Sequence, residues 1–442
     1  MTGAIITRRT CILATMAALG ASVLHSGSGN TREVGMAADR VERGTTRIKG
    51  FQSGELDFQL MRSLGAGNYG GATPGEIFAT RSAVAGDDPY AWRNALAGMG
   101  ERVLNAGREA LKRGHRVSAR DHFLRASMYY RAAEYSADPF GSEALPWGLA
   151  SRDAFRAAAE LMRDRIEPVE IPFEGKALPG YFMAPAGGAE RGKTILILTG
   201  FDGTGEELYF QTAAAALDRG YNVLVGEGPG QVGCLRQHPD LKFRPDYEKP
   251  IGAMLDFVLA RPEVGSERLA LYGISFGGYF VTRAAEHDGR IRALIANSPI
   301  IDLYAYMVGF VGPEFVANPP PVSLSEVDEI PDEEFPREAK LSFKSACRRF
   351  GVDSFAGWLA RLKDFHAEDK LAEIRCPTLA MVGTGEGEEA LRQAKRFAES
   401  VSGPVTERIF TTEEGADAHC QLGNLPLSNA VIFDWLDELF AA

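Results

Sequence analysis

Five short apolar runs follow one another after Glu167, and amphipathic helical patterns separate them. Near-continuous apolar runs of this length are typical of strands buried on both faces of a sheet. Strands that alternate with helices form a mostly parallel sheet covered on both sides. The alternation therefore predicts an α/β fold for this part of the chain. The runs are KTILILTG (193–200), YNVLVGEG (221–228), RLALYGIS (268–275), IRALIANSP (291–299) and PTLAMVGTG (377–385).

Two further segments belong to the same part of the chain. EPVEIPFEGKALPGYFMAP (167–185) precedes the alternation, and its pattern predicts an antiparallel hairpin at the sheet edge. Between residues 301 and 369 the alternation stops, and a proline-rich, acidic stretch leads into a helical one. A long insertion between two strands is usually functional or disordered. Its helices predict a small cap over one end of the sheet.

The region before the sheet has a helical rhythm. From about Asp87 to Met162, apolar residues recur at three- and four-residue steps. We expect residues 39–165 to form a helical lid domain and residues 166–442 to form the catalytic domain with its cap insertion.

The first 38 residues differ from the rest. Arg8 and Arg9 precede a moderate apolar run, Cys11 to Leu24, and small polar residues follow. This order is typical of a secretory signal, and the paired arginines resemble a twin-arginine export signal. We expect a signal peptide with a flexible tail and an exported protein, periplasmic or secreted. The alternative is an uncleaved N-terminal tail on a cytoplasmic protein.

Charge and cysteine content narrow the classes of partner. A formal net charge of −11 disfavours binding to nucleic acid or to an anionic membrane surface. No run reaches the roughly 20 apolar residues that span a bilayer. The cysteines show neither CxxC nor zinc-type spacing, so we expect no metal. The sequence implies no organic cofactor. The expected partner is a small-molecule substrate, and a homodimer is left open.

One motif within the alternation carries chemistry. LALYGISFGGYF (269–280) places Ser275 between Gly273 and Gly277, after an apolar strand and before a helical pattern. In the α/β-hydrolase fold, G-x-S-x-G at a strand-to-helix turn exposes the nucleophilic serine. Because both flanking elements are present, Ser275 is predicted to be a nucleophile. The alternative is a small residue in a glycine-rich turn.

A serine nucleophile needs a base, which in this fold comes last in the chain, in a loop after the last strand. VTERIFTTEEGADAHCQLGN supplies such a strand and loop with one histidine, His419. None of the other histidines follows a late strand. His419 is therefore predicted to be the base.

The acid has three candidates. It normally follows the penultimate strand, and there TLAMV leads into a loop with Glu386 at the expected place. Glu388 lies farther along the same loop. Asp302 follows the preceding strand, from which an acid can also reach the histidine. We favour Glu386 and keep Glu388 and Asp302 as alternatives.

An acyl-transfer site also needs two backbone N–H groups to stabilise the oxyanion. The first predicted donor is Phe276, directly after the nucleophile. The second should come from the loop after ILILTG, where Phe201 is the first candidate and Asp202 the second.

Several longer stretches extend the likeness to known proteins. The chain resembles the α/β-hydrolase superfamily, in a branch with 2,6-dihydroxypseudooxynicotine hydrolases, fungal hydrolases that shorten polyketide naphthopyrones, and fermentation-respiration switch-like proteins. The matching stretches are NYGGATPGE (68–76), GHRVSARDHFLRASMYYRAAEY (114–135), GFDGTGEELYF (200–210), EGPGQ (227–231) and ISFGGYFVTRAAEHDGRIRALI (274–295).

The resemblance implies a lid of N-terminal helices over the pocket, with Ser275 as nucleophile and His419 as base. It also implies cleavage of esters or of C–C bonds in β-diketone-like substrates. The branch usually has aspartate where this chain has Glu386.

The sequence thus predicts a serine hydrolase that acts on a small or medium carbonyl compound. The bond is an ester or a C–C bond of the β-diketone or aryl ketone type. One alternative is a prolyl-oligopeptidase-like peptidase, although the N-terminal region has a helical pattern where such enzymes have a propeller. The other is a hydrolase-fold binding protein without catalytic activity.

Overall fold

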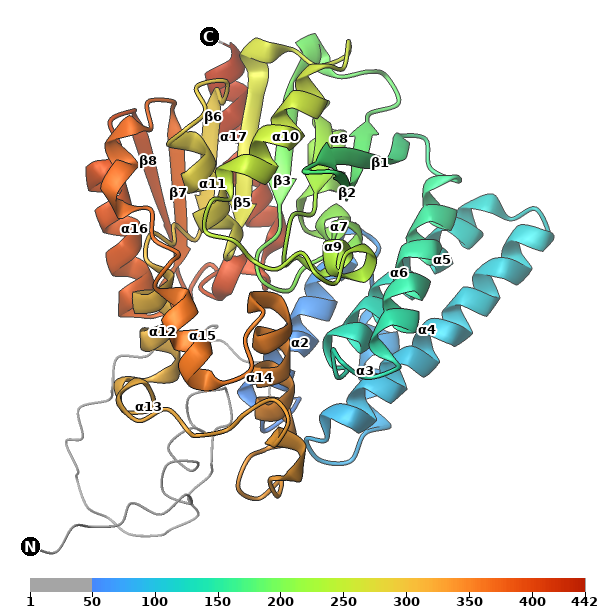
Figure 1. Ribbon diagram of the computed structural model, residues 1–442. Helices are drawn as coiled ribbons and strands as arrows, with labels where there is room; N and C mark the ends of the chain where they lie inside the picture. Colours follow the sequence, from blue (N-terminus) through green and yellow to red (C-terminus); the bar gives the residue numbers. More distant parts are fainter. Residues whose placement is uncertain (1–49, 442) are drawn as a thin grey trace, which may run out of the picture.

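The computed structural model describes residues 50–441 (Figure 1). The predicted export signal at residues 1–38 and the start of the predicted helical region at residue 39 lie outside the described residues. Within residues 50–441, each helix is either too short or too polar to cross a membrane.

The centre of the molecule is an eight-stranded sheet with the order β1-β2-β4-β3-β5-β6-β7-β8. The predicted edge hairpin is present, because β1 and β2 pair antiparallel and β2 pairs antiparallel with β4. All remaining neighbours are parallel, which confirms the predicted mostly parallel sheet. The strands are β1 (Arg165–Phe173), β2 (Lys176–Ala184), β3 (Thr194–Leu198), β4 (Asn222–Gly226), β5 (Leu269–Ile274), β6 (Ala293–Asn297), β7 (Thr378–Gly383) and β8 (Val405–Phe410).

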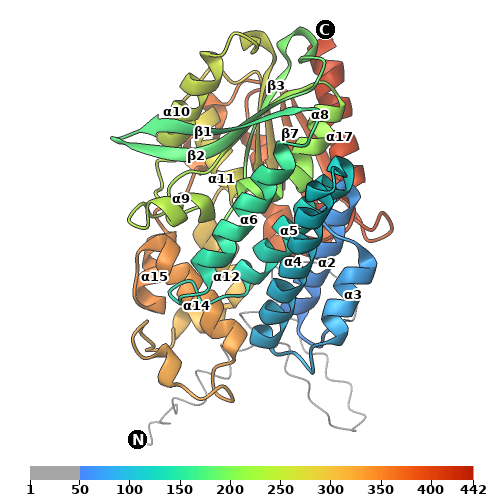
Figure 2. The ribbon, with the colours of Figure 1, turned by 90° about the vertical axis from the view of Figure 1, so that its right-hand side faces the viewer.

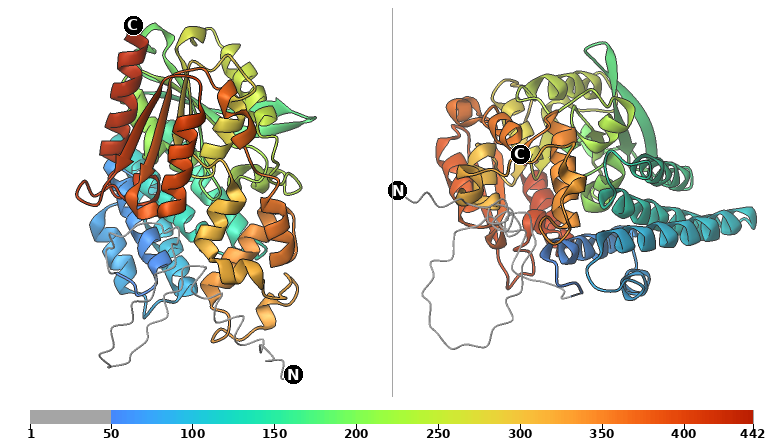
Figure 3. Two further views of the ribbon diagram at one scale, coloured as in Figure 1. Left: turned by 90° about the vertical axis from the view of Figure 1, so that its left-hand side faces the viewer. Right: turned by 60° about the horizontal axis from the view of Figure 1, so that its bottom comes forward.

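Helices cover both faces of this sheet because successive side chains of a buried strand point to opposite sides. In β3, Leu196 and Leu198 pack with α10, α11 and α16, whereas Ile195 and Ile197 pack with α8 and α17 (Figures 1 and 3). Apolar residues at consecutive positions are therefore all buried. The covering helices are α8 (Ala214–Asp218), α10 (Glu248–Leu259), α11 (Gly277–Ala285), α16 (Glu388–Ser400) and α17 (Leu425–Ala441).

Residues 54–159 form a group of helices beside the sheet, as the periodicity predicts (Figure 2). Thr73 and Asp88 cap α3 and α4, each followed by proline at the first helical position. Apolar residues of α2, α4 and α5 form a core of their own, and α5 and α6 also pack against the sheet and its covering helices. These helices are α2 (Gly54–Gly65), α3 (Pro74–Ser82), α4 (Pro89–Lys112), α5 (Arg116–Tyr135) and α6 (Ala144–Ala159).

The segment between β6 and β7 carries a second group of helices, within the predicted 301–369 insertion. They lie at the end of the sheet that also meets α2 (Figures 1 and 2). Aromatic side chains on α13, α14 and α15 pack on one another, with Phe343 and Phe355 stacked at 4.2 Å between ring centroids. The helices are α12 (Leu303–Val311), α13 (Pro313–Ala317), α14 (Arg337–Phe350) and α15 (Phe355–Leu362).

Buried ion pairs join the N-terminal helices to the loop that follows β3. Arg62 of α2 pairs with Glu207 at 2.5 Å and with Asp202 at 3.1 Å. Arg131 of α5 pairs with the same Glu207 at 3.3 Å and donates to the backbone carbonyl of Asp202. Glu207 lies on the short helix α7 (Gly205–Leu208), and its side chain is only 3% exposed. The two parts of the chain are thus connected by charges shielded from water.

We expect Glu207→Ala to lower the free energy of unfolding by about 3–5 kcal/mol, because it leaves two buried guanidinium groups without their shared carboxylate. Urea unfolding followed by circular dichroism measures this loss. Glu267→Ala is the control, since Glu267 is 71% exposed and pairs with the half-exposed Arg292. Its expected cost is under about 1 kcal/mol. Equal losses in the two variants would contradict the importance of the buried pairs.

Candidate active site

The turn between β5 and α11 holds Ser275 in a backbone conformation rare for a residue with a side chain. Its φ is +61°, in the left-handed region. A Cβ at Gly273 would lie 2.1 Å from the carbonyl oxygen of Gly277, and one at Gly277 would lie 2.8 Å from that of Leu198. The two glycines are therefore required for the tight crossing of strand, turn and helix. This geometry is that of a nucleophile elbow.

The structure brings Ser275, His419 and Glu386 together in one chain of hydrogen bonds. His419 Nε2 lies 2.8 Å from Ser275 Oγ, and His419 Nδ1 lies 2.5 Å from Glu386 Oε2. The side chain of Glu386 is fully buried, and that of His419 is 15% exposed. A carboxylate on Nδ1 fixes the tautomer in which Nε2 accepts the serine proton.

The Glu386 carboxylate has further partners that hold it in place. Ser298 Oγ donates to Oε2 at 2.6 Å, and the backbone N–H of Gly383 donates to Oε1 at 2.9 Å. Ser298 is not among the predicted site residues. It directly follows β6, so its position after a neighbouring strand is the signal that could have found it.

The two alternative acids lie at the starts of helices. Asp302 caps α12, where its Oδ1 accepts the backbone N–H of Ala305 at 2.9 Å. Glu388 is the first residue of α16. The carboxylate bonded to His419 is that of Glu386.

The loop after β3 runs directly against the elbow. A Cβ at Gly200 would lie 2.6 Å from the backbone nitrogen of Phe276 and 2.7 Å from Ser275 Cβ. Only glycine therefore permits this approach, which brings Phe201 and Phe276 to the same cavity as Ser275. Such an approach is what a two-donor oxyanion hole requires.

Gln231, which is also not among the predicted site residues, supports this loop. Its Nε2 donates to the carbonyl oxygen of Thr199 at 2.5 Å, and its Oε1 accepts the N–H of Gly228 at 2.6 Å. It thereby connects the loops after β3 and β4. The residue closes the EGPGQ stretch quoted above, and that stretch is the signal for it.

The surroundings of His419 change its basicity in opposite directions. Burial lowers the pKa of His419, but the adjacent Cys420 and the Glu386 carboxylate outweigh burial, so the pKa is raised above its ordinary value. The protonated imidazole is thus stabilised, as a general base requires once it has taken a proton.

This shift predicts the pH dependence of turnover. Only neutral His419 can accept the proton of Ser275, and a raised pKa moves the neutral form to higher pH. The value of kcat/KM should therefore rise with pH and reach half of its maximum well above pH 6.5, the ordinary imidazole pKa. Rates on a 4-nitrophenyl ester across the pH range, corrected with Ser275→Ala, measure the profile. A half-maximal kcat/KM at or below pH 6.5 would contradict the shift.

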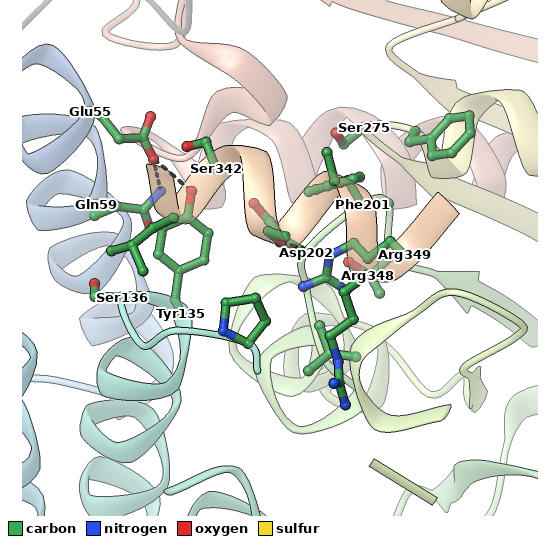
Figure 4. Close-up of a pocket in the computed structure, with 18 of the residues that line it drawn as sticks. Glu55, Gln59, Tyr135, Ser136, Phe201, Asp202, Ser275, Ser342, Arg348 and Arg349 are labelled. Carbon is green, nitrogen blue, oxygen red and sulfur yellow. Dashed lines mark hydrogen bonds between the residues drawn. The ribbon is translucent and has the colours of Figure 1, made fainter. Parts of the chain in front are cut away.

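Ser275 opens into a cavity of about 500 Å³ (Figure 4). Its wall combines elements that lie far apart in the sequence. For example, α2 contributes Gln59, α5 contributes Tyr135 and α14 contributes Arg349. Tyr135 donates to Glu55 at 2.6 Å on the wall formed by the N-terminal helices. Among residues 50–441, no group of His, Cys, Asp and Glu side chains is arranged to hold a metal ion.

Comparison with known proteins identifies the family. The chain is 31% identical over 418 residues to the alpha/beta hydrolase xenA of Xenoacremonium sinensis, covering 87% of this chain and 96% of that protein. It is 32% identical to the hydrolase LUC6 of Fusarium sp, covering 88% of this chain and 97% of the relative. The chain belongs to the α/β-hydrolase family. It is therefore an enzyme, as the sequence predicts.

Solved structures agree on the fold of this α/β-hydrolase. The crystal structure of the 2,6-dihydroxy-pseudo-oxynicotine hydrolase superposes with a TM-score of 0.66 at 20% identity, over 85% of this chain and 96% of the other. The likeness confirms the predicted α/β-hydrolase fold. Residues 246–321, which include the elbow, match the prolyl oligopeptidase family.

Proposed function

We propose that this α/β-hydrolase is a serine hydrolase with Ser275 as nucleophile, His419 as general base and Glu386 as the acid. The observation that carries the proposal is the unbroken hydrogen-bond chain from Glu386 through His419 to Ser275 at the wall of the cavity. Such a chain activates a hydroxyl that is otherwise a weak nucleophile.

The reaction follows from these positions. His419 Nε2 takes the proton of Ser275 Oγ as the oxygen attacks a substrate carbonyl carbon. The backbone N–H groups of Phe276 and Phe201 hold the developing oxyanion. His419 then gives the proton to the leaving group, and an acyl-enzyme remains on Ser275. Water, activated by the same histidine, releases the acid product and restores the serine.

The substrate we propose is a small or medium carbonyl compound. A cavity of about 500 Å³ lies within the range of small-molecule sites, about 300–1,000 Å³. Ester hydrolysis needs only the groups described above. Hydrolysis of a C–C bond additionally needs a carbanion that can leave as an enol or a phenol, so a β-diketone or aryl ketone would qualify.

We also propose that the helices of residues 54–159 act as a lid over this cavity. Support comes from the cavity wall, to which α2 and α5 contribute Glu55, Gln59 and Tyr135 (Figure 4). These side chains face the site from outside the catalytic domain and would contact the part of the substrate away from Ser275.

A fluorophosphonate probe tests the proposal, because it reacts only with an activated serine. Labelling of the wild type, and none of Ser275→Ala, is the expected result. An unlabelled wild type would favour a binding protein without catalytic activity. A parallel screen of 4-nitrophenyl esters, β-diketones and aryl ketones then identifies the bond that is cleaved.

The match of residues 246–321 to the prolyl oligopeptidase family keeps a peptidase as the second candidate. The N-terminal region is helical, however, and its helices α2 and α5 form part of the cavity wall. We therefore expect fluorogenic peptide amides to be cleaved far more slowly than esters. Faster cleavage of a peptide amide would reverse this order.

A further inference from the structure

Arg349 of α14 lies in the wall of the cavity into which Ser275 opens. Its guanidinium carbon lies 4.8 Å from the ring centroid of Phe201. Its Nε donates to Ser345 Oγ at 3.1 Å, and Nη1 donates to the carbonyl oxygen of Gly230 at 3.3 Å. A guanidinium has five N–H donors, so these two bonds leave capacity for a ligand. Figure 4 shows Arg349 beside Phe201 and Asp202.

Among the residues that the structure describes, Arg349 and its neighbour Arg348 lack the carboxylate partner that other arginines of the cavity wall have. Within residues 50–441, no carboxylate oxygen lies within 4.0 Å of the guanidinium of Arg349 or of Arg348. Three other arginines of the same wall each have a carboxylate partner, with Arg62 on Glu207, Arg131 on Glu207 and Arg236 on Glu134. The wall therefore carries two positive charges that its own carboxylates do not pair.

An unpaired guanidinium in such a place is costly for the free protein. Burial lowers the pKa of Arg349 to about 10, against the opposing effect of the Asp202 charge. Burial also lowers the pKa of Arg348. Both side chains are partly shielded from water, and such a charge is stabilised by an opposite charge with hydrogen bonds. An anion bound in the cavity would supply that charge.

We propose that Arg349 binds a carboxylate of the substrate, placed next to the carbonyl group that Ser275 attacks. The proposal rests on the proposed function and names the substrate class: carbonyl compounds with an acidic substituent. The planar guanidinium matches a carboxylate with two parallel hydrogen bonds. Arg349 packs on the ring of Phe201, whose backbone N–H is a proposed oxyanion donor, so the carboxylate would bind beside the subsite of the reacting carbonyl. Arg348, the preceding residue of the same helix, adds a second positive charge to the cavity wall.

Two matched pairs of esters test this specificity. Mono-4-nitrophenyl adipate and its primary amide place the carboxylate, or its neutral isostere, on the acyl side. 4-Carboxyphenyl butanoate and 4-carbamoylphenyl butanoate place it on the leaving group. The measured quantity is the ratio of kcat/KM for acid over amide within each pair. One pair should give a wild-type ratio well above one, and the pair that does so identifies the side of the scissile bond.

Variants of Arg349 then test whether this residue causes the preference for the acid over the amide. Arg349→Gln should lower that ratio by about 10- to 100-fold, as expected for loss of a charge-assisted pair, and Arg349→Lys should recover part of it. Arg375→Gln, at an 81% exposed arginine of the catalytic domain, is the matched control and should leave the ratio unchanged. Thermal unfolding checks that each variant is folded.

Two outcomes would overturn the proposal. The first is a wild-type ratio at or below one in both pairs, and the second is a ratio that Arg349→Gln leaves intact, whether both rates are unchanged or both fall equally. Each leaves the serine hydrolase assignment standing as long as the fluorophosphonate probe labels Ser275. Absence of both labelling and turnover would instead refute the proposed function itself.

Discussion

Replacing Ser275 with alanine should reduce turnover by about 10⁴- to 10⁶-fold while the protein remains folded. The substitution removes Ser275 Oγ, the proposed attacking atom, which lies 2.8 Å from His419 Nε2. Alanine faces the same strained φ of +61° as serine does, so the backbone of the elbow gains no additional strain. Stopped assays on an activated ester, together with a melting curve, measure both properties.

The residual rate of this variant is informative as well. The proposed oxyanion donors Phe276 and Phe201 remain in Ser275→Ala, so a small rate above that in water is compatible with the mechanism. A folded variant with wild-type turnover would show that the nucleophile is elsewhere.

Replacing Glu386 with glutamine should cost about 10⁴-fold in kcat, by analogy with the amide exchange in the serine-protease triad. The carboxylate accepts hydrogen bonds from His419 Nδ1 and from Ser298 Oγ on the same oxygen, Oε2. An amide nitrogen at that position would donate to the ring and favour the wrong tautomer. The imidazolium formed during attack would also lose its counter-charge.

Conservative and distant variants show whether the loss belongs to this carboxylate. Glu386→Asp should be milder, because the turn Thr384–Glu386 lies between glycines and can absorb part of one methylene. Glu388→Gln and Asp302→Asn should each cost under about 10-fold, roughly 1.4 kcal/mol. Determination of kcat for all four on one ester decides between them. A large loss in Asp302→Asn with a small one in Glu386→Gln would reassign the acid.

Much of this architecture could be predicted because its determinants are local. The strand β5, the elbow and α11 are contiguous in the chain, so one motif with its flanks indicated Ser275. His419 and Glu386 could be found because each follows a strand that ends at the same edge of a parallel sheet. The order of the residues along the chain was therefore enough to predict that their side chains lie close together.

Other features depend on contacts that no local pattern specifies. Arg62 and Arg131 meet Glu207 across more than 70 positions of sequence, and Ser298 meets Glu386 across 88. Each arginine alone could equally have been a solvated surface residue. The role of Gly200 was hidden for a related reason, because the backbone it must clear belongs to the distant turn at Ser275.

The ion pairs between the N-terminal helices and the loop after β3 have a consequence for protein engineering. Arg62 and Arg131 hold Asp202 and Glu207, and those two residues flank a turn that adjoins Phe201. The helices and this loop therefore depend on each other and should not be exchanged separately. A chimaera that takes its N-terminal helices from a relative should carry along residues 200–207 from the same parent. If the helices and residues 200–207 came from different parents, buried charges on both segments could lose their ion-pair partners.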